Sequence, residues 1–299
     1  MGFITGAGGT NIDLLYSGME RIPDVGEELY SEDFSLQLGG GLPATLINLS
    51  RLNIKTKIAT QLGQDMFSDF AKSEFKKAGA DIVNLYSGNK IPLTITSAVI
   101  LPEDRTFFSF TGYTEPDDRM KEEFYQMSKG ADITLMERSG YLDVYKKLHE
   151  EGTLLILDTG WDDNMSLEAY SDYLEIADFY TPNQKEAMKI TAKNTPEEAA
   201  YTLKKYFDKV VIKLDKDGCL GLDDEIFYVR SIDEFNHVDS TGAGDAFLAG
   251  FAYGLYHRYP FKDSILFGNI TGGKAVTKAG ALSAHLTEKE LLEFYEKYK

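Results

Sequence analysis

Short apolar runs rich in β-branched residues alternate along this chain with longer amphipathic segments, and this alternation constrains the fold more than any other feature. The strand-like runs are Phe3–Thr5, Lys57–Thr60, Leu154–Leu157, Phe179–Tyr180 and Val210–Lys213. The helix-like segments are Ala44–Arg51, Asp65–Lys77, Met165–Ile176, Pro196–Phe207 and Ala246–Tyr256. Strands interleaved with helices of about ten residues or more indicate βαβ units. The pattern therefore predicts an α/β core with a mostly parallel sheet covered by helices on both faces.

Two stretches depart from this rhythm and read as antiparallel, half-exposed strands. They are Leu29–Leu38 and Leu93–Thr111, the second with a turn signal at Pro102–Asp104. Their alternating pattern is typical of strands with one solvated face. We expect a small β-sheet appended to the core, with its strands inserted within residues 13–40 and 91–113 of a single domain spanning residues 1–299. The aromatic side chains Phe107, Phe108 and Phe110 would suit such a sheet for covering a cleft, a partner subunit, or both.

The charge of the chain excludes two classes of partner. With 31 basic and 48 acidic residues the formal net charge is -17, which opposes binding to nucleic acids and to anionic membranes. No apolar run approaches the roughly 18 residues of a membrane-spanning helix, and the amino terminus lacks the pattern of a secretory signal. The single cysteine, Cys219, requires no oxidising compartment. We therefore expect a soluble cytoplasmic protein without nucleic-acid or membrane partners.

The segment Asp239–Phe247, DSTGAGDAF, places glycines and a carboxylate at the start of an apolar helix. Free N–H groups and the positive end of the helix dipole meet there, so Gly242, Ala243 and Gly244 are suited to holding a phosphate. Asp245 beside them could take the proton of an attacking alcohol. A capping carboxylate on a tight turn explains the same residues equally well. We expect the glycines further along, Gly250 and Gly254, to pack this helix closely on the sheet.

DSTGAGDAF also resembles the carboxy-terminal signature of the ribokinase family of sugar and nucleoside kinases, the PfkB carbohydrate kinases. Other segments similar to family motifs follow the family's order over nearly the whole chain: Gly9–Asp13, Gly39–Thr45, Leu62–Phe67, Thr181–Glu186 and Val211–Gly218. The resemblance implies a three-layer α/β/α core with a β-sheet lid, and an enzyme that phosphorylates a hydroxyl group with ATP and Mg²⁺. It also implies a dimer formed through the lid strands.

The resemblance assigns the amino-terminal motifs to the sugar. Asp13 would bind sugar hydroxyls with Asn11 as a helper, and Gly40 and Gly41 would face the sugar. The family's usual asparagine at the end of this motif is Thr45 here, so one sugar contact is altered. The turn at Gly63–Phe67 is implied to be structural.

The same resemblance assigns the later motifs to the nucleotide and to metal ions. Asn183 and Glu186 would organise Mg²⁺ and phosphate, Glu186 through a water molecule. Lys213 and Gly218 would flank the nucleotide. The segment Gly268–Ala275 resembles a phosphate-binding loop but lacks its final hydroxyl, and we interpret it as a helix lining the nucleotide site with Asn269 near the adenine. Asp239 and Thr241, with help from Ala279–Ser283, match positions that hold a monovalent cation, so activation by K⁺ is expected.

The identity of the acceptor is less constrained by the sequence. The segment Leu157–Asp163 is acidic where relatives that take charged substrates carry basic residues, which favours a neutral sugar. Arg105 and Arg138 are the remaining basic candidates, and we assign Arg105 to the lid turn. A nucleoside kinase that stacks the base on Phe108 or Phe110 is the alternative of the same class. An inactive sugar- or nucleotide-binding regulator is disfavoured because Asp245, Asn183 and Glu186 are all retained.

Overall fold

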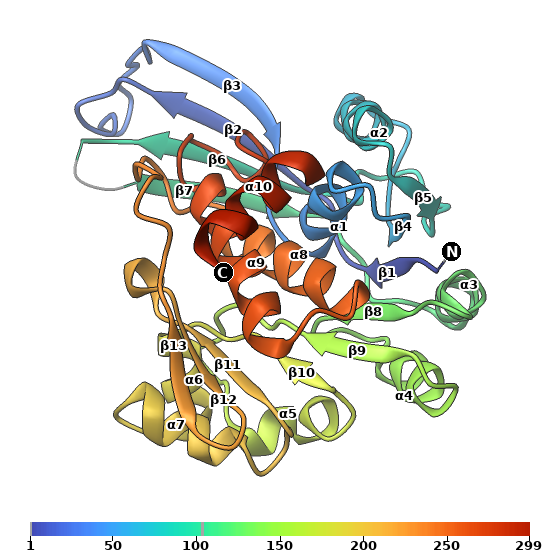
Figure 1. Cartoon of the computed structure of the whole chain (residues 1–299). Helices are drawn as coiled ribbons and strands as arrows, with labels where there is room; N and C mark the ends of the chain where they lie inside the picture. Colours follow the sequence, from blue (N-terminus) through green and yellow to red (C-terminus); the bar gives the residue numbers. More distant parts are fainter. Residues whose placement is uncertain (1, 103–104) are drawn as a thin grey trace.

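A six-stranded parallel sheet forms the centre of the molecule, as the alternating pattern predicts (Figure 1). The structure, a computed structural model, describes residues 2–102 and 105–299. The strand order is β10-β9-β8-β1-β4-β5. The strands are β1 Ile4–Ala7, β4 Thr56–Thr60, β5 Asp81–Asn84, β8 Ile133–Met136, β9 Leu154–Leu157 and β10 Phe179–Tyr180. The sequence did not reveal β5 and β8.

Helices cover both faces of this sheet, and each face has its own hydrophobic core. Successive strand residues point to opposite faces, so Leu135 packs into one core and Met136 into the other. The first core is completed by α1 Leu42–Arg51, α2 Met66–Ala78, α8 Ala243–Tyr256, α9 Phe261–Ala275 and α10 Glu288–Tyr298. The second is completed by α3 Asp118–Ser128, α4 Leu142–Glu150, α5 Leu167–Leu174, α6 Gln184–Thr191 and α7 Pro196–Leu203. No helix in the described ranges is both long and apolar enough to cross a membrane.

The helices occupy the predicted segments with small shifts at their ends. The carboxylate of Asp65 accepts hydrogen bonds from the N–H groups of Phe67 and Ser68 and so starts α2, which confirms the structural turn there. The glycines of α8 were assigned to the wrong neighbour. A Cβ on Gly250 would lie 2.3 Å from Phe267 O, and one on Gly254 would lie 2.6 Å from Ser264 Cα, so these glycines allow α8 to approach α9 and not the sheet.

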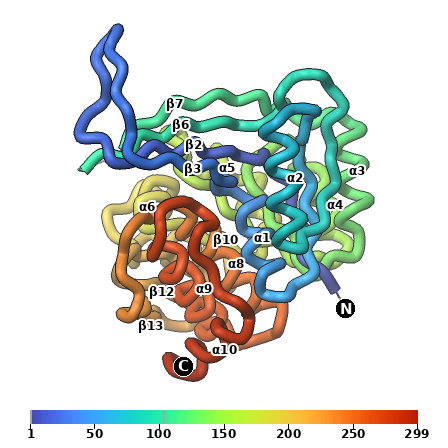
Figure 2. Tube along the Cα trace, turned by 90° about the horizontal axis from the view of Figure 1, so that it is seen from above, coloured from blue at the N-terminus to red at the C-terminus, as the bar shows by residue number. Residues whose placement is uncertain are grey.

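A four-stranded lid sheet extends beyond the core (Figures 1 and 2). It consists of β2 Asn11–Ser17, β3 Asp33–Leu38, β6 Thr94–Ile100 and β7 Arg105–Thr111, in the order β3-β2-β6-β7. The strand predicted at Leu29–Leu38 begins only at Asp33. The lid strand β2 begins at Asn11, two residues before the predicted limit at residue 13. Two pairings are antiparallel, but β2 and β6 run parallel, which corrects the prediction of a purely antiparallel lid. Of the predicted turn at Pro102–Asp104, residues 103 and 104 lie outside the described residues.

The strand at Val210–Lys213, β11, does not extend the parallel sheet by regular pairing. It pairs antiparallel with β12 Cys219–Leu222, which pairs with β13 Ile226–Val229. The connection after β11 is the short turn η1 Asp215–Asp217 followed by Gly218 at φ 90°, and so short a connection allows only an antiparallel neighbour. The N–H of Lys213 still donates to Pro182 O at 2.9 Å, which holds the end of β11 beside the end of β10.

Candidate active site

The carboxyl ends of β1 and β8 define the position of the site. The chain proceeds from β1 to β4 on one side and returns to β8 on the other, so the strand order reverses between β1 and β8. Parallel sheets bind ligands outside the strand ends at such a point. Gly8 follows β1 and Glu137 follows β8, and a Cβ on Gly8 would lie 3.5 Å from Glu137 Oε1. Asp158 directly follows β9 at the same edge.

Asp245 lies in the first turn of α8 and faces the double-glycine segment. Its Oδ2 accepts a hydrogen bond from the N–H of Gly41 at 3.1 Å. A Cβ on Gly40 would lie 2.6 Å from the same oxygen, so only glycine allows this approach. The pKa of Asp245 is raised to about 7: burial is the largest cause and Asp158 adds to it, whereas the hydrogen bond from Gly41 and the charge of Lys213 oppose the rise. The carboxyl group therefore changes charge near neutral pH, as a general base requires.

Asp13 and Asn11 reach the same segment from the lid strand β2. A Cβ on Gly39 would lie 2.8 Å from both carboxylate oxygens of Asp13. Asn11 Nδ2 donates to Gly40 O at 3.3 Å. Burial raises the pKa of Asp13 to about 6. The structure thus brings together the residues that the sequence assigned to the sugar.

Thr45 lies on α1 behind this group. Its side chain is fully buried, and its Oγ1 has no hydrogen-bond partner within the described part of the chain. Buried polar atoms are normally satisfied. The orphaned hydroxyl is the kind of group that a bound polar ligand would complete.

Glu137 is a functional candidate that the sequence reasoning missed. Its pKa is raised to about 7, chiefly by burial and further by the charges of Asp158, Asp245 and Glu115. It therefore shares an electrostatic environment with Asp245. The available signal was an acidic residue directly after the short apolar run Ile133–Met136, which places a carboxylate at the end of a strand.

The segment Gly242–Gly244 forms the turn that leads into α8. Within the described residues the N–H groups of Gly242 and Gly244 have no hydrogen-bond acceptor, whereas that of Ala243 donates to Ser240 O at 3.2 Å. A Cβ on Gly242, at φ 76°, would lie 2.5 Å from Ala281 Cα, so this glycine is required by close packing. Two of the three predicted amide donors are therefore available to an anion, and the third is used by the turn.

Lys213 supplies the positive charge beside this turn. A Cβ on Gly244 would lie 3.5 Å from Lys213 Nζ, and the ammonium pairs with Asp158 Oδ2 at 3.3 Å. Burial lowers the pKa of Lys213, but Asp158 and Glu186 raise it more, and the net shift is upward. The ammonium therefore stays charged, next to the backbone that is suited to phosphate.

Asn183 and Glu186 form the capping box that starts α6. Asn183 Oδ1 accepts from the N–H of Glu186 at 3.0 Å, and Glu186 Oε2 accepts from the N–H of Asn183 at 2.8 Å. The pattern thus has a complete local explanation in helix capping. Burial raises the pKa of Glu186, with Lys213 opposing the rise.

The described residues contain no cluster of three or more side chains able to hold a metal ion by themselves. Mg²⁺ usually binds through one or two carboxylates, water molecules and substrate phosphates. Asp158 and Glu186 both act electrostatically on Lys213, so two carboxylates lie near that ammonium.

Gly218 directly precedes β12, and Asn269 of α9 contacts the first residue of that strand. Asn269 Nδ2 donates to Val229 O and Arg230 O, and its Oδ1 accepts from the thiol of Cys219 at 3.0 Å. A Cβ on Gly218 would lie 2.1 Å from Val229 O. Contact of either residue with a nucleotide stays a prediction.

The side chains of Asp239 and Thr241 contact each other, and Arg105 of the lid binds to both. Arg105 Nη1 donates to Asp239 Oδ1 at 2.7 Å and to Thr241 Oγ1 at 2.5 Å. Arg105 begins β7 directly after the predicted lid turn, and its side chain reaches across to the loop before α8.

Comparison with known proteins agrees with this fold. The chain is 23% identical over 282 residues to a ribokinase of Lactococcus lactis subsp. lactis, covering 92% of this chain and 90% of the relative. It is 23% identical over 269 residues to fructoselysine 6-kinase of Escherichia coli, covering 88% and 100%. A crystal structure of ribokinase from Thermotoga maritima superposes with a TM-score of 0.84 at 21% identity, covering 99% and 100%. The structure of Arabidopsis thaliana ribokinase complexed with ribose and ATP gives 0.84 at 20% identity, covering 99% of each chain.

The profile of the pfkB family carbohydrate kinases matches residues 8–288, which include every motif described above. The chain belongs to the pfkB family of carbohydrate kinases.

Proposed function

We propose that this kinase transfers the γ-phosphoryl group of ATP to a hydroxyl of a neutral sugar, with Asp245 as the general base. The observation that carries the proposal is the position of the Asp245 carboxylate. It lies between the double-glycine segment, which Asp13 and Asn11 reach from the lid, and the turn whose N–H groups are available to a phosphate.

The residues of the site divide into an acceptor side and a phosphate side. On the acceptor side Asp13, Asn11 and Glu137 would hold sugar hydroxyls, and Asp245 would accept the proton of the reacting one. On the phosphate side, three groups would stabilise the negative charge of the phosphoryl group during its transfer: the N–H groups of Gly242 and Gly244 and the ammonium of Lys213. Mg-ATP, when bound, would supply the phosphoryl group and the cation that neutralises its developing charge. Glu186 and Asp158 would orient the hydrated ion.

A neutral acceptor follows from the charges on the acceptor side. Asp13, Glu137 and Asp245 all carry carboxyl groups, which would repel an acidic or phosphorylated substrate. The two arginines considered for such a substrate are engaged elsewhere. Arg138 pairs with Asp162 at 3.5 Å and lies over the ring of Tyr170, and Arg105 binds Asp239.

The test is a coupled assay of ADP formation over a panel of neutral sugars, acidic sugars and nucleosides, with wild type and Asp245→Asn. We expect turnover with a neutral sugar and a loss of about 10²–10⁴ in the variant, the usual effect of removing a general base. Calorimetric binding of ATP should persist. Asp263→Asn is the matched control, because Asp263 lies in the first turn of the neighbouring helix α9.

The panel also separates the alternatives. Preferential turnover of a nucleoside would replace the sugar proposal. An Asp245→Asn enzyme with near-normal turnover would remove Asp245 from the role of base. A wild type that binds ATP but turns over no acceptor would favour a regulatory binding protein.

A further inference from the structure

Arg105 connects the lid sheet to the loop before α8. This loop holds Asp239 and Thr241 and leads into the turn at Gly242–Gly244, here called the phosphate-binding turn. Arg105 begins β7, and its partner Asp239 lies 134 residues further along the chain. The guanidinium contacts both side chains that were expected to hold a monovalent cation, Asp239 Oδ1 at 2.7 Å and Thr241 Oγ1 at 2.5 Å. The side chains of Arg105 and Asp239 are 38% and 16% exposed, so the pair lies at the edge of the protein and not in its core.

Both oxygens of the Asp239 carboxylate accept hydrogen bonds in this arrangement, and Oδ1 accepts three. Besides Arg105, its Oδ1 accepts from the N–H and the hydroxyl of Thr241 at 3.1 and 2.9 Å. Its Oδ2 accepts from the N–H of Gly280 at 2.9 Å. A monovalent cation needs free oxygen ligands and is repelled by a guanidinium already at the same oxygen. Asp239 and Thr241 therefore do not fit an additional K⁺ ion while Arg105 is in place.

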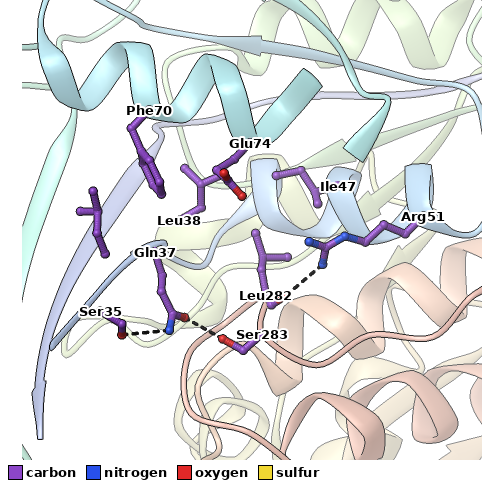
Figure 3. Close-up of a pocket in the computed structure, with 10 residues that line it drawn as sticks. Ser35, Gln37, Leu38, Ile47, Arg51, Phe70, Glu74, Leu282 and Ser283 are labelled. Carbon is purple, nitrogen blue, oxygen red and sulfur yellow. Dashed lines mark hydrogen bonds between the residues drawn. The ribbon is translucent and has the colours of Figure 1, made fainter. Parts of the chain in front are cut away.

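The loop on the other side of Asp239 is fixed to the fold (Figure 3). Arg51 of α1 donates to Leu282 O at 3.1 Å, and Ser283 donates to Gln37 of β3 at 2.8 Å. These bonds lie at a cavity of about 290 Å³ between β3, α1, α2 and residues 282–283. Ala281 in the same loop packs against Gly242. Asp239 thus joins a fixed loop, the phosphate-binding turn and the lid.

We propose that Arg105 takes the place of the monovalent cation and positions the phosphate-binding turn from the lid. The guanidinium supplies the positive charge that Asp239 and Thr241 need, and it does so only while β7 lies over the site. Arg105 is then a positioning residue, and the enzyme needs no K⁺. The inference rests on the proposed function only in that the turn at Gly242–Gly244 binds phosphate.

Steady-state rates in potassium chloride and in tetramethylammonium chloride at equal ionic strength test the proposal. The wild type is expected to turn over equally in both salts. Arg105→Gln should fall by about tenfold or more in tetramethylammonium, because a displaced loop misaligns the phosphoryl group, and should recover in potassium. The control is Arg21→Gln. Arg21 lies in the connection between β2 and β3 and pairs with Glu27, not with Asp239. This variant should behave as the wild type in both salts.

Thermal unfolding with Mg-ADP gives a readout that does not depend on the acceptor. Potassium should raise the melting temperature of Arg105→Gln and leave that of the wild type unchanged, because an ion stabilises a protein only where it binds. Potassium activation of the wild type would overturn the proposal, as would an Arg105→Gln enzyme that is fully active in tetramethylammonium or not rescued by potassium. If Arg105→Gln does not fold, the wild-type comparison decides. Failure to find an acceptor would leave the melting experiment valid.

Discussion

At the scale of single residues, the site concentrates carboxyl groups whose pKa values are raised. Asp13, Glu137 and Asp245 titrate at about 6, 7 and 7, and burial is the largest cause for each. Ionised carboxylates that lose water are destabilising unless a ligand satisfies them. The candidate site therefore gives up stability in the free protein and holds carboxyl groups that change charge near neutral pH.

This cost can be measured at Glu137. Because its pKa rises from 4.5 to about 7 on folding, the folded protein binds the proton more tightly than the unfolded chain. The free energy of unfolding must then fall as pH rises between these values. Glu137→Gln removes the titration, so we expect it to stabilise the ligand-free protein at about pH 8, by no more than about 3 kcal/mol.

Urea unfolding of wild type and Glu137→Gln at several pH values checks this prediction. The difference should vanish at about pH 3, where Glu137 is protonated in both states of the wild type. The control is Asp263→Asn, which removes a carboxylate outside the site. Asp263 accepts a hydrogen bond from the hydroxyl of Tyr295. A Glu137→Gln variant that is less stable than the wild type at about pH 8 would contradict the assignment.

At the scale of elements, helix starts provide most of the site. Asp245 lies in the first turn of α8, the double glycine precedes α1, and the capping box of Asn183 and Glu186 starts α6. Helix starts present free N–H groups, which explains why glycines and carboxylates gather there. Because Asn183 and Glu186 lie at the start of α6, helix capping explains their presence and a role at the site remains a prediction.

Two glycines beside helix ends allow the cost of a left-handed backbone conformation to be distinguished from the cost of steric crowding. Gly242 and Gly79 have similar φ values, 76° and 72°, but a Cβ on Gly242 would meet Ala281 at 2.5 Å, whereas one on Gly79 would have no neighbour within 4 Å. Gly79→Ala should cost about 1 kcal/mol of stability, from the left-handed conformation alone, with normal turnover.

Gly242→Ala carries the same conformational cost but must also displace the turn at Gly242–Gly244, which we propose binds phosphate. We therefore expect turnover to fall by about tenfold or more, which steady-state kinetics and thermal melts of both variants would measure. Equal turnover of the two variants would show that the geometry of this turn does not limit the reaction.

At the scale of the whole molecule, the lid sheet leaves an aromatic edge strand in solvent. β7 lies at the edge of the sheet, and Phe107, Phe108 and Phe110 are 52%, 67% and 53% exposed. Exposed apolar edge strands usually have a partner. We propose that two copies of the chain pair through this strand.

Sedimentation velocity over a range of concentrations tests the dimer. The wild type should sediment as a dimer, and Phe108→Lys should shift it to a monomer by placing charge in the interface. Tyr201→Lys, at an exposed aromatic residue on α7 outside the lid, is the control. A wild type that remains monomeric at high concentration would exclude the dimer.

Much of the architecture was predictable because its signals are local. The alternation of apolar runs and amphipathic segments indicated the parallel core, and Leu154–Leu157 and Phe179–Tyr180 were located as observed. The motifs at Gly39–Thr45 and Asp239–Phe247 indicated the parts of the site, because glycine, carboxylate and helix start follow one another within a few residues. β5 and β8 were missed because such short runs resemble ordinary hydrophobic segments, and β11 was misassigned because pairing direction depends on the connection that follows.

The sequence by itself determined the fold class and the family, and it predicted Asp13 and Asp245 as site residues, since each of these follows from local pattern or motif. Only the tertiary structure placed Glu137 beside Asp245 and joined Arg105 to Asp239. These neighbours come from distant segments, and their approach depends on how strands order in the sheet and how the lid lies over the core. Local side-chain preferences act over one or two helical turns and carry no information about such contacts.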